Sequence, residues 1–151
     1  MAGQRRRRID ERRDPRAIPT PAADGEALTR SAVCAMLDEV LLAAQDARRA
    51  VTVVVAEARG GVESLPPNLG EVVRPHVRDT DIVWPIGPRA VTLVLVDADG
   101  PSSEVAVSRI RGEVTATARL GIALGRATAS PGIHGGELID LATANLMGLK
   151  N

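Results

Sequence analysis

Apolar residues follow helical spacing early in the part of the chain that we expect to fold. Two series with i, i+4 spacing lie side by side: Leu28, Ala32, Met36, Val40 and Ala44, and then Val33, Leu37 and Leu41. Asp24, followed by Gly25 and Glu26, is a suitable N-cap. The pattern predicts a long helix that begins near residue 24 and has a wide buried face, with Cys34 as a small buried thiol within it.

Four segments have the pattern of β-strands. Residues 51–57 are rich in valine, and residues 80–96 predict two strands around a turn at residues 87–90. A fourth strand is expected near residues 116–124. Trp84 lies in the first strand of the hairpin, where we expect it to pack and stiffen the hairpin rather than to form a binding platform.

Three further helices complete the predicted order of elements. A short one is expected over residues 69–78, one over residues 102–114 with Ser102 or Ser103 as its N-cap, and one over residues 136–149. The order is therefore α, then βαββαβ, then α. This is the split βαβ order of a ferredoxin-like α+β fold, an antiparallel sheet whose crossover helices share one face.

Composition excludes several classes of protein. The 151 residues contain no Phe, no Tyr, one Trp and one Cys, so aromatic base stacking, an intrachain disulfide and a cysteine metal cluster are all excluded. No apolar run is long enough to span a bilayer. We expect one folded domain without a transmembrane segment, located in a reducing cytoplasm. Eighteen arginines against one lysine are typical of a high-GC genome.

Charge is uneven along the chain. Residues 1–23 contain seven arginines and three acidic residues, a balance of +4, so the remaining residues carry −4 of the zero total. With three prolines and few apolar residues, this segment predicts a disordered Arg-rich arm before a folded domain at residues 24–151. A solvated tail is the favoured interpretation of the arm. Contact with nucleic acid, an anionic membrane or an acidic protein is the alternative.

Four segments, in chain order, resemble the GGDEF domain, the diguanylate cyclase family that makes cyclic di-GMP from GTP. Ala27-Leu28-Thr29-Arg30 is similar to the family's "DxLTxLxNR" opening, "RDTDIVWPIGPRAVTLVL" to "RxxDxxxRxGGDEFxxLL", "ATARLGIA" to "VTVSIGVA", and "ELIDLATANLMGLKN" to "ELLxxADxALYxAKxxGRN". The resemblance spans residues 24–151. It implies the nucleotide-cyclase-like version of the predicted βαββαβ fold.

The signature itself is degenerate. Gly87 is retained, Pro88 replaces the second glycine, Arg89 and Ala90 replace the acidic pair, and Val91 replaces phenylalanine. The resemblance implies two divalent metal ions, held by carboxylates on the first strand and on this hairpin. Such ions need oxygen ligands, which a guanidinium and a methyl group do not supply.

Other parts of the family's active site also lack counterparts. Glu57, near the position of the family's metal aspartate, is a single carboxylate. The loop after it is too short for the family's guanine-recognition segments, and Asn68 aligns poorly with them. Lys150 matches a phosphate-contacting lysine, but the basic residue that often follows is missing. We therefore expect no cyclase activity, no bound metal and no cofactor.

Arg78 and Asp81 form an RxxD pattern at the spacing at which the family places its product-binding inhibitory motif. The resemblance implies a cyclic di-GMP site, in which a guanidinium stacks on a purine or contacts phosphate while a carboxylate accepts from the guanine edge. The alternative is a solvated ion pair. His76 and His134 are expected to be surface residues, since no second ligand is spaced with either.

The sequence thus predicts a catalytically inactive GGDEF-like domain. It would act as a signalling interaction module, with a protein partner or as a homodimer, or as a cyclic di-GMP receptor through Arg78 and Asp81. A residual cyclase with unusual metal ligands and a purely structural or dimerisation protein are the alternatives.

Overall fold

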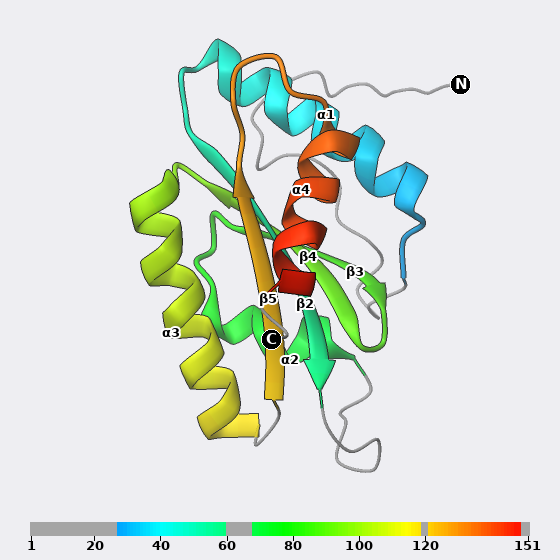
Figure 1. Cartoon of the computed structure of the whole chain (residues 1–151), viewed down its shortest axis with the longest axis vertical. Coiled ribbons are helices and arrows are strands. Elements are labelled where there is room, and N and C mark those ends of the chain that lie inside the picture. Colours follow the sequence, from blue (N-terminus) through cyan, green and yellow to red (C-terminus); the bar gives the residue numbers. More distant parts are fainter. Residues whose placement is uncertain (1–26, 60–67, 119–120, 149–151) are drawn as a thin grey trace, which may run out of the picture.

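The computed structural model describes residues 27–59, 68–118 and 121–148 (Figure 1). The elements, in chain order, are α1 (Arg30–Asp46), β2 (Val51–Arg59), α2 (Leu69–Val73), the 3₁₀ helix η3 (Arg74–His76), β3 (Ile82–Gly87), β4 (Ala90–Val96), α3 (Gly100–Ala118), β5 (Gly121–Thr128) and α4 (Gly135–Gly148). This is the predicted order. The Arg-rich arm at residues 1–23 and the predicted N-cap Asp24 lie outside the described residues.

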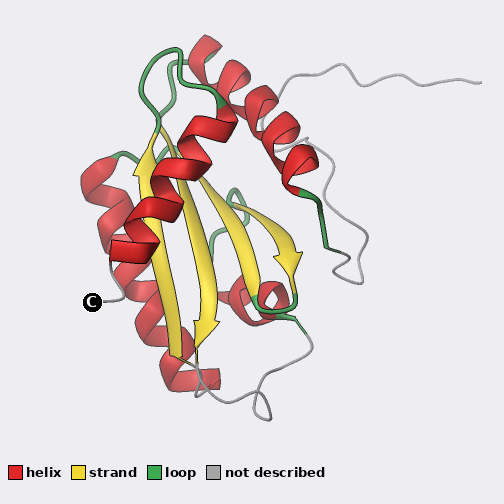
Figure 2. Ribbon diagram, turned by 45° about the vertical axis from the view of Figure 1, so that its right-hand side comes forward, coloured by secondary structure: helices red, strands yellow, loops and turns green. Residues whose placement is uncertain are grey.

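The four strands form one sheet in the order β3-β4-β2-β5, in which every neighbouring pair is antiparallel. β4 lies between β2 and β3, and β2 lies between β4 and β5, which is the split βαβ topology (Figure 2). Val51 pairs with Val96 at one end of β2, and Glu57 pairs with Ala90 near the other. The α+β fold predicted from the sequence is confirmed.

The centre of the sheet is buried on both faces, because helices cover both of them. Val53 and Val55 of β2 pack in the core that includes α1 and α4, whereas Val54 and Ala56 pack in the core that includes α2 and α3. The crossover helices α2 and α3 thus share one face, as predicted, and the two flanking helices cover the other (Figure 2). Trp84 is completely buried in the α1–α4 core, which confirms its packing role.

The first helix begins later than predicted. Thr29 has extended backbone angles, and its hydroxyl accepts a hydrogen bond from the Ala32 amide at 3.1 Å, so Thr29 is the N-cap. Leu28 lies before the helix, where its amide donates to the carbonyl of Pro85 in the edge strand β3 at 2.9 Å. A threonine cap and this strand contact therefore determine where the helix starts. Cys34, expected to be buried, is only partly buried.

The N-cap of α3 also differs from the prediction. The Asp99 carboxylate accepts from the Ser102 amide at 3.0 Å, and the Ser102 hydroxyl contacts the Asp99 amide at 3.1 Å. This reciprocal pair places the cap at Asp99 and the first helical residue at Gly100. The amide of Ser102, helped by its hydroxyl, lowers the pKa of Asp99 below the ordinary value of 3.8. Ser103 instead lies buried inside the helix, where its hydroxyl donates a hydrogen bond to the Gly100 carbonyl at 2.9 Å.

Two predicted boundaries shift further along the chain. α3 continues to Ala118, so the first three residues of the strand predicted at 116–124 are helical instead. β5 begins at Gly121 and continues to Thr128, whose hydroxyl lies 2.7 Å from that of Thr52 in β2. The alternating Thr and Ala residues before Arg119 suit either structure, and here the long amphipathic helix extends through them.

α2 is shorter than the helix predicted over residues 69–78. Asn68 caps it by accepting from the Glu71 amide at 3.2 Å, and the chain tightens into η3 at Arg74. Pro75 has no amide hydrogen and follows Arg74, the C-cap of α2. In the described part of the chain, no helix is long and apolar enough to cross a membrane.

Candidate functional site

The tip of the β3–β4 hairpin is held against the end of β2. The Arg89 carbonyl accepts from the Ala58 amide at 2.8 Å, and the Pro88 carbonyl accepts from the Leu69 amide at the start of α2 at 2.9 Å. The register between β3 and β4 shifts between Pro85 and Gly87, where the strands turn. The residues of the hairpin tip, Gly87 to Ala90, therefore have a fixed position, with β2 on one side and α2 on the other.

Val91, which follows the hairpin tip, is completely buried in the core shared with α2 and α3. The Ala90 backbone lies opposite Glu57 in the β2–β4 ladder. The hairpin is thus packed and paired as far as its tip.

The side chains at this end of β2 are charged, and positive charge predominates. The Arg89 guanidinium donates from Nη2 to the Ala58 carbonyl at 3.2 Å, while its Nη1 is buried and has no acceptor in the described part of the chain. Glu57 lies with its Oε1 3.2 Å from Nη2 of Arg59. The three side chains sum to +1, and the single carboxylate already has a cationic neighbour.

No three His, Cys, Asp or Glu side chains within the described ranges are close enough together to hold a metal ion. Arg59 was not singled out from the sequence, although its place two residues after Glu57 puts both side chains on one face of β2. Lys150 and the loop at residues 60–67 lie outside the described residues.

Arg78 and Asp81, the predicted RxxD pair, bind each other. Nη2 of Arg78 donates to Oδ1 of Asp81 at 3.0 Å, and the Arg78 amide donates to Oδ2 at 3.0 Å. The same Nη2 also donates to the Val96 carbonyl at the end of β4, at 2.9 Å. The pair therefore connects the turn before β3 to the end of β4.

The two partners differ in exposure. The Asp81 side chain is 3% exposed, whereas that of Arg78 is 52% exposed. The alternative of a solvated ion pair is therefore wrong for the carboxylate, which is buried under the turn, and holds only for part of the guanidinium. Both Asp81 oxygens already accept hydrogen bonds from Arg78.

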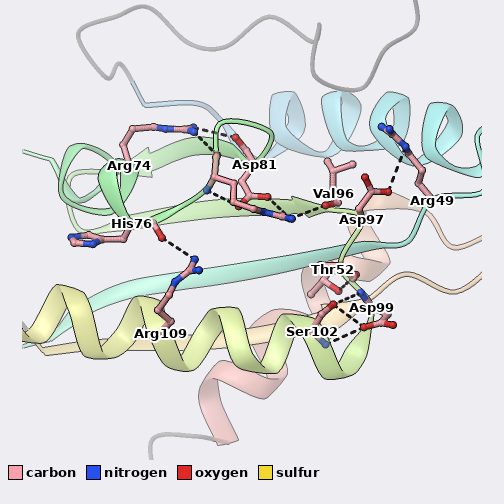
Figure 3. A network of polar contacts seen from close by, with 12 residues as sticks. Arg49, Thr52, Arg74, His76, Asp81, Val96, Asp97, Asp99, Ser102 and Arg109 are labelled. Atoms are coloured by element: carbon pink, nitrogen blue, oxygen red, sulfur yellow. Dashed lines mark hydrogen bonds and ion pairs between the residues drawn. The ribbon is translucent and has the colours of Figure 1, made fainter.

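Arg74 is a third member of this group that the sequence analysis did not identify. Its guanidinium donates to the Asp81 carbonyl at 3.1 Å (Figure 3). It also donates to the Arg78 carbonyl at 2.7 Å. The spacing of four residues between Arg74 and Arg78 is the only signal in the sequence. Both arginines thus stabilise the same turn.

The two histidines have different environments. His134 is exposed, as predicted. His76 is at the surface only in part, because its side chain is 16% exposed and its Nδ1 lies 2.9 Å from Oε1 of Glu113 on α3. Arg109, also on α3, donates to the His76 carbonyl at 3.1 Å (Figure 3). η3 is thus docked on α3 by polar contacts.

Comparison with known proteins identifies the fold. No family model and no curated protein sequence matches the chain. The GGDEF domain of DgcB from Caulobacter crescentus, in complex with c-di-GMP, is similar with a TM-score of 0.70 and 17% identity over 93% of each chain. The active GGEEF domain of a diguanylate cyclase from Vibrio cholerae has a TM-score of 0.68 and 14% identity, over 83% of this chain and 92% of that one.

A third similar structure contains a protein partner. The diguanylate cyclase SiaD from Pseudomonas aeruginosa, in complex with its activator SiaC, has a TM-score of 0.70 and 15% identity over 90% of this chain and 59% of its own. The chain therefore has the fold of the GGDEF domains of diguanylate cyclases. At these identities the likeness establishes the fold, and function has to be argued from the site.

Proposed function

We propose that this chain is a GGDEF-fold domain without cyclase activity, which acts by contacting a protein partner or a second copy of itself. The observation that carries the proposal is the position of Arg89. Its carbonyl and its guanidinium both bond to Ala58 at the end of β2, so a fixed positive charge occupies the hairpin tip.

Electrostatics argues against a metal ion at this tip. Two unit charges of the same sign about 4 Å apart repel by about 4 kcal/mol at an effective dielectric constant of about 20, and a divalent ion doubles that energy. Ala90 offers no oxygen ligand from its side chain. Glu57 would have to leave Arg59 in order to bind a cation alone.

The experiment is a product assay. Purified protein is incubated with GTP and either Mg²⁺ or Mn²⁺, with an active diguanylate cyclase as the positive control, and cyclic di-GMP is measured by mass spectrometry. We expect no product. Product that accumulates with time and is lost in Glu57→Gln would favour the alternative, a residual cyclase with unusual ligands.

The contact itself is supported by the retained fold and by SiaD, whose structure includes a protein activator. Sedimentation velocity over a hundredfold range of concentration tests the version with a second copy. A mass that rises towards that of a dimer supports it. If the protein is a monomer at every concentration, contact with a second copy is excluded and the proposed partner is a different protein.

A second candidate is a cyclic di-GMP receptor at Arg78 and Asp81, and the half-exposed guanidinium of Arg78 favours it. Against it, the Asp81 carboxylate is already bonded on both oxygens, so a guanine edge would have to displace Arg78. Calorimetric titration with cyclic di-GMP tests whether the chain is such a receptor. Binding that Arg78→Ala weakens and Arg111→Ala leaves unchanged supports the receptor, and a flat titration excludes it.

We also propose that residues 24–151 are the folded unit and that the Arg-rich residues 1–23 form a tether outside it. Deletion of residues 1–23 should leave the melting temperature unchanged. A large drop would show instead that the arm belongs to the folded unit.

A further inference from the structure

We propose that a cavity between α1, α4 and the sheet binds a small carboxylic acid that carries a second oxygen atom. Arg30 would contact the carboxylate and Thr92 the second oxygen. The site goes beyond the protein contact proposed above and does not depend on it.

The cavity has a volume of about 260 Å³ and lies on the face of the sheet that α1 and α4 cover. The apolar part of its lining consists of Leu28, Val33, Val55, Ile86 and Ile139. All five side chains belong to the α1–α4 core or pack against it, so the fold itself holds this wall in place. Binding sites for small molecules are typically concave and largely apolar, with a few polar groups that orient the ligand.

A buried hydroxyl is the first of these polar groups. Thr92 lines the cavity and is 1% exposed, and its hydroxyl makes no hydrogen bond with another described residue. Its place is fixed, because Thr92 pairs with Val55 of β2 and with Trp84 of β3. A buried hydroxyl without a partner is costly. An oxygen atom of a ligand would accept the hydrogen bond that this hydroxyl can donate.

A guanidinium is the second polar group. Arg30 is the only charged residue among the described residues that line the cavity, and its side chain is 57% exposed, which places it at the mouth. Its Nη2 donates to Oδ1 of Asp140 at 2.9 Å. Both partners of this pair are mostly exposed, so the pair contributes little to stability, and the guanidinium has further donors to offer.

The two polar groups define the class of ligand. A carboxylate accepts strong, charge-assisted hydrogen bonds from a guanidinium, and Arg30 gives the mouth of the cavity a positive charge. The buried hydroxyl of Thr92 and the apolar wall lie further inside. A short acid with an apolar body and a ketone or hydroxyl oxygen therefore matches the cavity in charge and polarity.

Levulinate, a short acid with one ketone oxygen, is the probe for an NMR titration of the isotope-labelled full chain. We expect saturable shifts at the amides of the lining residues, with a Kd on the order of 1 mM. Arg30→Gln should weaken binding about tenfold, and Thr92→Val about threefold. The matched controls Arg111→Gln and Thr115→Val, both in α3 on the other face of the sheet, should leave the affinity unchanged.

Two related compounds separate the two contacts. Valerate lacks the ketone oxygen and methyl levulinate lacks the charge, so both should bind more weakly than levulinate. Thr92→Val should not change the affinity for valerate, and Arg30→Gln should not change that for methyl levulinate. Thr92→Ser, which keeps the hydroxyl, should bind levulinate more tightly than Thr92→Val does.

Four results would overturn the proposal. They are the absence of saturable binding, equal affinities for the three compounds, equal losses in the α3 controls, and binding that appears only after residues 1–23 are deleted. In the last case the chain's own arm, and not an acid, would be the occupant of the cavity.

Discussion

The amide and the guanidinium of Arg78 both donate to the carboxylate of Asp81, three residues further along the chain, at 3.0 Å each. The carboxylate is buried, and the guanidinium continues to the Val96 carbonyl. A motif that resembles a ligand site thus also determines the path of the chain into β3. Any role in binding has to coexist with this structural one.

Asp81→Ala should destabilise the domain by roughly 2–3 kcal/mol, because the Arg78 amide loses its acceptor and the guanidinium loses its counter-ion. Urea unfolding followed by circular dichroism measures the change. Asp79→Ala is the control, since Asp79 is exposed and lies two residues away. A cost below about 0.5 kcal/mol in Asp81→Ala would show that the ion pair does not hold the turn.

Gly125→Ala should be among the most damaging small substitutions in the chain. A Cβ there would lie 2.2 Å from the Leu146 amide nitrogen and 2.3 Å from the Ala142 carbonyl oxygen, so α4 would have to move away from β5. We expect a loss of about 3 kcal/mol or more, measured by thermal unfolding. Gly112→Ala, in α3 with nothing within 4 Å, should instead stabilise by up to about 1 kcal/mol. Similar melting temperatures for the two variants would contradict the close packing of α4 on β5.

Asp99 makes stability depend on pH in the acid range. Its pKa is lowered in the folded state by the Ser102 amide and hydroxyl, so its contribution is present above the unfolded value and is lost as pH falls through the lower folded value. Asp99→Asn keeps a capping side chain that does not titrate. We expect the variant to lose less stability than the parent between pH 5 and pH 2, measured by urea unfolding at each pH. If the free energy of unfolding fell equally with pH in the two proteins, Asp99 would not contribute to stability through its lowered pKa.

The sequence predicts the order of elements and the hairpin because valine-rich strands and Gly/Pro turns are local signals. A local signal also predicts the position of four residues at the hairpin tip, because the Gly/Pro turn alone places them there: Gly87, Pro88, Arg89 and Ala90. The caps at Thr29 and Asp99 were not predicted, because several Ser, Thr and Asp residues near each helix start could cap it. The contact between Leu28 and Pro85 favours the first cap, and the reciprocal hydrogen bonds with Ser102 favour the second. Burial of Asp81 and the bonds from Arg74 depend on how the turn folds back over β4, which no local pattern encodes.

Site-specific binding of Mn²⁺ distinguishes a GGDEF fold with a metal site at the hairpin tip from one in which Arg89 and Ala90 prevent metal binding, as we propose. Paramagnetic broadening of backbone amide signals locates a bound Mn²⁺ ion without any need for turnover. We expect no selective broadening at Glu57, Ala58 or Ala90 as Mn²⁺ is added. Saturable broadening at these residues that disappears in Glu57→Gln would contradict it.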